Sequence, residues 1–109
     1  MLYIFVCEDN AVQRQAIVQT IQNTVLIEEL DMRLVLDTGD PYVLLEKIKG
    51  SQSTGIYFLD IDLGSNINGM KLAQQIRLFD PRGFIIFITA HSELSYMTFQ
   101  YRVEAMDFV

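Results

Sequence analysis

The sequence is poor in cysteine and in basic residues. Its single cysteine, Cys7, has no partner within the chain, so no internal disulfide can form and a reduced, cytoplasmic setting is expected. Eight Lys and Arg residues are set against 14 Asp and Glu residues, which gives a net charge of -6. Because nucleic-acid backbones are bound through clustered Lys and Arg, we do not expect this chain to bind DNA by itself.

Long hydrophobic runs are also missing. No apolar stretch approaches the roughly 20 residues that cross a bilayer, so no membrane segment is expected. The apolar stretch 1–7 has neither a basic leader nor a cleavage site, which argues against a signal peptide. The 109 residues are 50% hydrophobic, which predicts one globular domain over 1–109.

Short apolar runs alternate with amphipathic segments along the chain. The runs predict buried strands, and the segments between them, several opened by Asp or Asn caps, predict helices. The expected strands are 2–7, 32–37, 55–60, 84–88 and 105–109, and the expected helices are 11–24, 41–49, 69–79 and one that begins at Ser92 and carries Leu94, Met97 and Tyr101. This alternation predicts an α/β fold with a doubly wound, parallel, five-stranded sheet.

Polar side chains follow three of the predicted strands. Glu8 and Asp9 follow the first strand, Asp60 and Asp62 lie at the end of the third, and Thr89 follows the fourth. The carboxyl ends of parallel strands meet at one edge of a sheet, so these side chains are expected to converge. Crowded carboxylates repel one another, and an all-oxygen set of this kind suits Mg²⁺. One carboxylate could then attack phosphorus, with Thr89 donating a hydrogen bond to a phosphoryl oxygen.

Four motifs occur in the order of these strands: Glu8-Asp9, Phe58-Leu59-Asp60-Ile61, Ile88-Thr89-Ala90 and Ala105-Met106-Asp107-Phe108-Val109. This ordered set resembles the receiver domain of bacterial two-component response regulators. The segments 7–10 and 57–63 look most like the accessory-gene-regulator and competence-regulator branch, whose members usually carry a LytTR-type DNA-binding domain after the receiver. The resemblance implies a flavodoxin-like sheet with strand order 2-1-3-4-5.

The resemblance also implies a metal site and a phosphate site. Asp60 would be the phosphoacceptor, and Mg²⁺ would be bound by Glu8, Asp9, Asp60 and the backbone carbonyl of Asp62. The implied phosphate donor is a sensor histidine kinase, and the chain itself would not be an enzyme.

Three further residues have implied roles in switching. Thr89 would bind the phosphoryl group and move toward it, Ala90 would leave room for that group, and Phe108 would be the aromatic switch. The implied result is a change in dimerisation, and DNA would be bound only through an effector domain outside this chain.

The sequence departs from the family pattern in three places. The lysine that the family has two residues after the position of Val109, and the final helix, are not in the sequence, so the chain is interpreted as a receiver cut short at strand five. An exposed apolar patch, covered by self-association or a partner, is expected on the face that lacks this helix. Glu104 replaces a frequent Gly, and the loop 63–69 replaces the Met-Pro pair that often follows the phosphoacceptor.

Two other functions fit parts of the pattern. Asp60-Ile61-Asp62 also matches the Asp-x-Asp nucleophile motif of haloacid-dehalogenase-type phosphatases, although that motif would then sit on the third strand and leave Glu8-Asp9 without a role. A flavin-binding module of flavodoxin type shares the sheet topology, but the acidic first loop would repel the flavin phosphate. Cys7 is interpreted as a buried strand residue and His91 as an ordinary surface residue.

Overall fold

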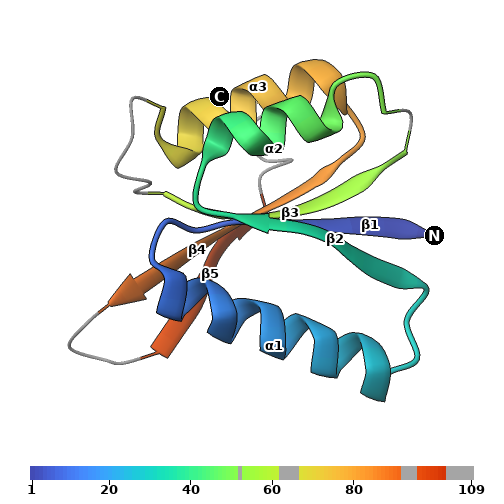
Figure 1. Cartoon of the computed structure of the whole chain (residues 1–109), viewed down its shortest axis with the longest axis vertical. Helices are drawn as coiled ribbons and strands as arrows, with labels where there is room; N and C mark the ends of the chain where they lie inside the picture. The colour runs from blue at the N-terminus through green and yellow to red at the C-terminus, as the bar shows by residue number, and fades with distance from the viewer. Residues whose placement is uncertain (52, 62–66, 92–95, 103–109) are drawn as a thin grey trace.

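A computed structural model of the chain describes residues 1–51, 53–61, 67–91 and 96–102, with side chains included up to residue 88. Up to residue 91 strands and helices alternate, and the last described element is a further strand (Figure 1). The elements in order are β1 (Leu2–Cys7), α1 (Ala11–Ile27), β2 (Met32–Thr38), α2 (Pro41–Ile48), β3 (Gly55–Asp60), α3 (Gly69–Phe79), β4 (Phe84–His91) and β5 (Tyr96–Arg102).

The strands form one sheet in the order β2-β1-β3-β4-β5. The first four strands in this order are parallel, which confirms the predicted α/β fold and the order 2-1-3-4. Helices α2 and α3 cover one face of the sheet and α1 covers the other (Figure 1). The carboxyl ends of β1 and β3 therefore lie side by side at one edge of the sheet.

The end of the chain differs from the sequence prediction. Residues 96–102, expected in a helix, form β5, which pairs antiparallel with β4. The sequence explains the difference, because Met97, Phe99 and Tyr101 alternate with polar residues at the period of a strand, and aromatic residues favour strands. The fifth strand predicted over 105–109 lies outside the described residues.

Short polar side chains fix where the helices begin, as the sequence predicts. The Oδ1 atoms of Asn10 and Asp40 accept hydrogen bonds from the backbone N–H groups of Gln13 at 3.0 Å and Tyr42 at 2.9 Å. Asn68 caps α3 in the same way, at 2.9 Å from the Lys71 nitrogen. Each cap satisfies a backbone donor that the first helical turn leaves unpaired, and so places each helix start directly after its strand or loop.

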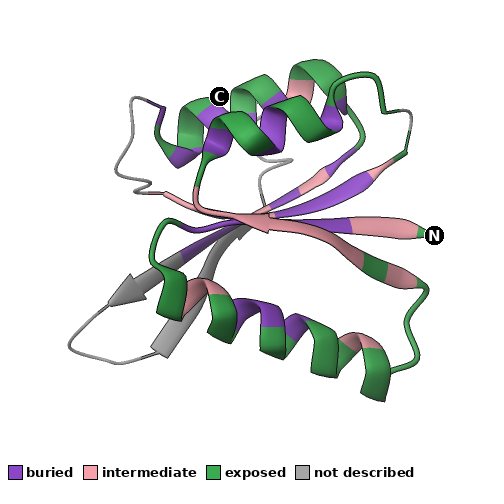
Figure 2. Cartoon of the chain, in the orientation of Figure 1, coloured by how far each residue is buried: buried purple, intermediate pink, exposed green. Residues whose placement is uncertain are grey.

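The core has two layers because side chains alternate across the strands. Phe5, Cys7, Tyr57 and Leu59 pack toward α2 and α3, whereas Ile4, Val6, Ile56 and the partly buried Phe58 pack toward α1. Figure 2 shows the buried residues on the sheet and on the helix faces that point toward it. β1 and β3 are neighbouring inner strands of the sheet, and the acidic residues lie at or just after their carboxyl ends.

A buried polar contact fixes the start of β3. The Asp80 Oδ2 atom accepts a hydrogen bond from the Tyr57 hydroxyl at 2.7 Å and another from the Gly55 backbone nitrogen at 2.8 Å. Burial, and then Asp80, raise the pKa of the Tyr57 hydroxyl above its ordinary value. Asp80 follows α3, so this contact ties the end of α3 to the first residue of β3.

The α1 face carries an apolar groove of about 280 Å³ between α1 and the sheet. It is lined by Ile4, Thr20, Ile21, Thr24, Val25, Leu30, Met32, Ile56 and Phe58. Among the helices that the structure describes, none combines the length and the apolar character needed to cross a membrane.

Candidate functional site

The loop after β1 holds Glu8 in a defined position. The Glu8 backbone nitrogen donates to the Thr38 carbonyl oxygen of β2 at 3.0 Å, which extends the β1–β2 pairing by one residue. The Glu8 side chain turns inward, is 2% exposed, and accepts a hydrogen bond from the Asn10 backbone nitrogen at 2.9 Å. The same Asn10 caps α1, so the start of the helix and the Glu8 carboxylate are fixed together.

Asp60 lies at the end of β3, between β1 and β4. Its neighbour Leu59 is in register with Cys7, and Asp60 itself is in register with Ile88 of β4. The start of α3 is held against this strand end, because the Gly69 backbone nitrogen donates to the Ile61 carbonyl oxygen at 2.8 Å. The Asp60 side chain is half-buried at the edge of the sheet.

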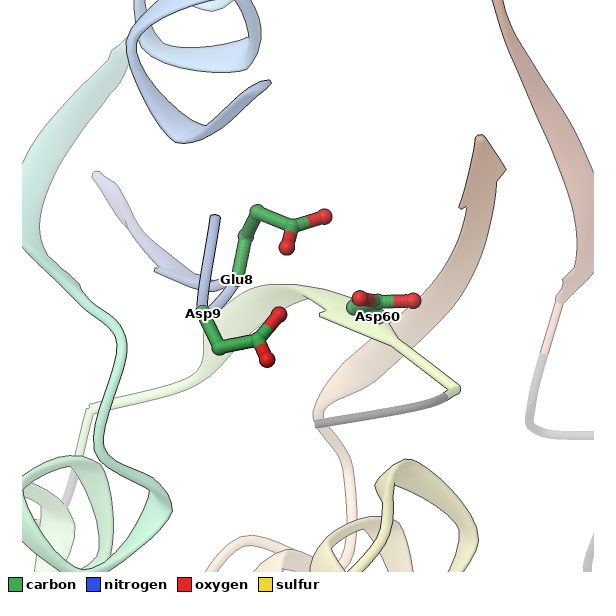
Figure 3. A group of neighbouring side chains, drawn as sticks. All are labelled: Glu8, Asp9 and Asp60. Atoms are coloured by element: carbon green, nitrogen blue, oxygen red, sulfur yellow. The ribbon is translucent and has the colours of Figure 1, made fainter. Parts of the chain in front are cut away.

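Three carboxylates meet at this edge. Glu8, Asp9 and Asp60 each offer an oxygen atom, and these atoms lie within 4.8 Å of one another. Figure 3 shows the Glu8 and Asp9 carboxylates extending from the β1–α1 loop toward the side on which Asp60 lies. The group combines a buried, an exposed and a half-buried carboxylate, so one side of it faces solvent.

The crowding changes the acidity of Glu8. Burial raises the pKa of the Glu8 carboxyl to about 8, and the neighbouring Asp9 and Asp60 carboxyls add to the rise, while the hydrogen bond from Asn10 opposes it. A carboxylate that is costly to ionise beside two others is stabilised when a cation neutralises the group. The donor set consists of hard oxygen atoms with an open side, which fits Mg²⁺ better than a metal that prefers nitrogen or sulfur ligands.

Cys7, directly before this loop, does not belong to the acidic group. Its side chain is fully buried, and burial, followed by the negative charges of Asp40 and Glu8, raises the pKa of its thiol to about 12. A thiolate is the reactive form of cysteine, so Cys7 acts as a small apolar core residue, as predicted from the sequence.

Comparison with known families identifies this arrangement. The model of the response regulator receiver domain matches residues 4–109. The chain belongs to the response regulator receiver family. Family membership agrees with the carboxylate group at the ends of β1 and β3 and favours a receiver over a haloacid-dehalogenase-type phosphatase.

Relatives of the receiver are found among staphylococcal regulators. The chain is 55% identical over 106 residues to accessory gene regulator protein A of Staphylococcus epidermidis and 52% identical to the protein of that name in Staphylococcus aureus. Each alignment covers 97% of this chain and 44% of the relative, so the chain spans less than half the length of these proteins. The branch predicted from the sequence is therefore confirmed.

A solved structure supports the fold alone. The receiver matches a fusion protein that carries a trimeric coiled coil of yeast Spc42, with a TM-score of 0.67 and 21% sequence identity. The match covers 84% of this chain and 56% of the fusion protein.

Of the remaining predicted site residues, the structure describes the backbone of two and leaves the other two outside the described residues. Thr89 and Ala90 lie in β4, where their backbones are in register with Thr98 and Met97 of β5. Asp62 and Phe108 lie outside the described residues. The structure thus brings together three of the predicted residues, Glu8, Asp9 and Asp60, and the roles of all the site residues remain predictions.

One residue at this edge was not predicted from the sequence. Arg14, on α1, donates from Nη1 to the Glu8 carbonyl oxygen at 2.9 Å. The available signal was its spacing, since Arg14 follows the cap Asn10 by four residues and so lies one helical turn above the acidic loop. One of its partners is the backbone carbonyl of Glu8 and the other is Asp37 on β2, and no local sequence pattern reveals either contact.

Proposed function

We propose that this receiver is the phosphoacceptor domain of a response regulator and that Asp60 receives the phosphoryl group. The observation that carries this proposal is the convergence of Glu8, Asp9 and Asp60 within 4.8 Å at the carboxyl edge of the sheet. Three carboxylates this close repel one another, and a bound cation would relieve that repulsion. The donor is the phosphohistidine of a sensor histidine kinase.

Asp60 is better placed to attack phosphorus than Glu8. Glu8 is 2% exposed and one of its oxygens already accepts a hydrogen bond from Asn10, so a phosphoryl group has little access to it. Asp60 is half-buried and lies at the end of a central strand. An Asp60 carboxylate oxygen forms the new bond to phosphorus as the bond from phosphorus to the histidine nitrogen breaks, and the nitrogen keeps the electron pair.

Glu8, Asp9 and Asp60 would hold Mg²⁺, with the Asp62 backbone carbonyl as a further ligand. A bound Mg²⁺ supplies positive charge that neutralises the oxygens of an incoming phosphoryl group. The Glu8 and Asp9 side chains, supplied by one rigid loop, would set the position of the ion relative to Asp60. Because Mg²⁺ uses carboxylates and keeps several waters for a phosphate, this small set of ligands suits it.

Phosphorylation would act through a two-state equilibrium. Thr89 would hydrogen-bond the phosphoryl group, Ala90 would leave space for it, and Phe108 would turn inward. The shifted state would favour a homodimer and DNA binding by a C-terminal LytTR-type domain. This part of the proposal rests on the resemblance of the sequence to the accessory-gene-regulator branch; the staphylococcal relatives carry that name and are more than twice as long as this chain. A cytoplasmic location follows from the same proposal.

A phosphate-affinity gel after incubation with acetyl phosphate and Mg²⁺ tests the acceptor. We expect a slower band for the wild-type chain and no such band for Asp60→Asn. Asp31→Asn is the matched control, because Asp31 is exposed and lies in the α1–β2 connection, and it should keep the band. A slower band that persists in Asp60→Asn would show that another residue is the acceptor.

A further inference from the structure

Arg14 joins three parts of the acidic edge. Its Nη1 atom donates to the Glu8 carbonyl oxygen at 2.9 Å, and its Nε atom lies 3.3 Å from Asp37 Oδ1. The Arg14 and Asp37 side chains are 20% and 32% exposed, so the pair is more protected from solvent than an ordinary surface ion pair. One guanidinium therefore contacts the β1–α1 loop and the end of β2 at the same time.

The backbone explains why these groups meet. The Arg14 nitrogen donates to the Asn10 carbonyl oxygen at 2.8 Å, which places Arg14 one turn after the cap and above the loop. Asp37 is in register with Val6, two residues before Glu8. Since the Glu8 nitrogen already donates to Thr38 at 3.0 Å, the contact from Arg14 fixes the other side of the same residue. The Glu8 main chain is thus held through both its N–H and its carbonyl group.

Gly39 leaves the space that the guanidinium needs. A Cβ atom on Gly39 would lie 3.1 Å from Arg14 Nη1 and 3.3 Å from the Asp9 Cα atom. Both distances are shorter than ordinary van der Waals contact, so a side chain there would push the guanidinium or the loop. Arg14 and Gly39 thus pack closely against the Glu8–Asp9 loop, and Asp37 lies beside the guanidinium.

We propose that Arg14 is a positioning residue of the magnesium site: its guanidinium fixes the loop that carries Glu8 and Asp9, and Asp37 holds the guanidinium in place. This inference rests on the proposed function, which assigns Glu8 and Asp9 to the metal. Arg14 contacts the backbone carbonyl of Glu8, so the side-chain carboxylates of Glu8 and Asp9 would stay available to bind Mg²⁺. Groups that orient metal ligands in this indirect way change metal affinity about 10- to 100-fold when they are removed.

Calorimetric titration of the chain with MgCl₂ measures this effect. We expect Arg14→Gln to raise the Mg²⁺ Kd about 10-fold or more. Arg33→Gln is the matched control, because Arg33 is exposed on β2 at the opposite end of the strand, in register with Tyr3, and its loss changes the net charge equally. That variant should keep a Kd close to the wild-type value.

Two further variants separate positioning from folding. Arg14→Lys should recover part of the affinity, because an ammonium group can reach one partner but lacks the planar fork that engages two. Asp37→Asn removes only the negative charge beside the guanidinium and leaves the contact of Arg14 with the Glu8 carbonyl in place. It should therefore raise the Mg²⁺ Kd less than Arg14→Gln does. If Arg14→Gln does not fold, Gly39→Ala, which crowds the guanidinium while leaving it charged, is expected to weaken Mg²⁺ binding instead.

A second readout needs no metal. In Mg²⁺-free buffer the amide resonances of Glu8, Asp9 and Asn10 should move in Arg14→Gln and stay in place in Arg33→Gln. A folded Arg14→Gln chain with the control's Kd, or with unmoved loop resonances, would overturn the positioning role. If the wild-type chain binds no Mg²⁺, the metal part of the proposed function fails, and the loop resonances alone then decide whether Arg14 positions the loop.

Discussion

The Gly69 main chain lies directly against the carbonyl group of Asp60. A Cβ atom built on Gly69 would stand 2.3 Å from the Asp60 carbonyl oxygen and 2.8 Å from the Ile61 Cα atom. Both contacts are to backbone, which cannot rotate aside as a side chain can. The close approach of α3 to the end of β3 therefore requires a residue without a side chain at position 69.

Gly69→Ala should move the end of β3 or the start of α3 and so disturb the acceptor site. We expect a loss of roughly 1–3 kcal/mol in the free energy of unfolding, the usual range for overpacking, and slower phosphorylation by acetyl phosphate. Urea unfolding and the phosphate-affinity gel measure the two effects. Met70→Ala, at the exposed next residue, is the control, and equal effects of the two variants would contradict the steric explanation.

The raised pKa of Glu8 predicts a pH-dependent stability. Its pKa is about 8 in the folded chain against an ordinary value of 4.5, so between these values the folded state holds a proton more tightly than the unfolded state. The contribution to stability is therefore complete below about pH 4.5 and is lost as the pH rises toward 8. Mg²⁺ should restore stability at the upper end by binding the ionised group.

Urea unfolding in Mg²⁺-free buffer at a series of pH values checks this expectation. Glu8→Gln removes the titrating group and should flatten the decline in the free energy of unfolding. Glu28→Gln, at the exposed C-cap of α1, should keep the wild-type profile. A decline that is equally steep in Glu8→Gln would show that another group causes it.

The Tyr57 hydroxyl is expected to stabilise the fold from the opposite edge of the sheet. Tyr57→Phe removes the buried hydrogen bond of 2.7 Å to Asp80, and bonds to charged groups contribute about 1.5–3 kcal/mol. We expect a loss of that order in the free energy of unfolding, with an unchanged Mg²⁺ Kd. Tyr42→Phe, at a residue that is 52% exposed, should change the stability by less than about 0.5 kcal/mol. Equal losses in both variants would contradict the role of the buried bond.

Cys7 should be unreactive in the folded chain. Its thiol is buried and its pKa is raised to about 12, so almost no thiolate is present at pH 8. We expect Ellman's reagent to react rapidly with the urea-unfolded chain and very slowly with the folded chain. An equally fast reaction in both states would mean that the carboxyl end of β1 readily exposes Cys7 to solvent.

Much of the sheet and of the acidic group could be predicted from the sequence because the signals are local. Apolar runs define β1, β3 and β4, and Asn10 and Asp40 mark the helix starts through contacts with their own first turns. Glu8, Asp9 and Asp60 could be brought together because parallel strands end at one edge.

Other features depend on contacts that no local pattern reveals. Residues 96–102 satisfy two periods, since Met97 and Tyr101 fit a helical face while Met97, Phe99 and Tyr101 also alternate as in a strand. Pairing with β4, a contact between segments, decides for the strand. Arg14 was missed for a similar reason, because its partners are a backbone carbonyl and a residue of β2.

The most direct test of the central proposal locates the phosphoryl group chemically. Borohydride reduces an aspartyl phosphate to homoserine, which peptide mass spectrometry identifies at a single position. After treatment of the wild-type chain with acetyl phosphate and Mg²⁺, we predict homoserine at position 60 and none at position 9. Reduction at position 9 or at the Glu8 carboxyl, with position 60 unchanged, would contradict the assignment of Asp60 as the phosphoacceptor.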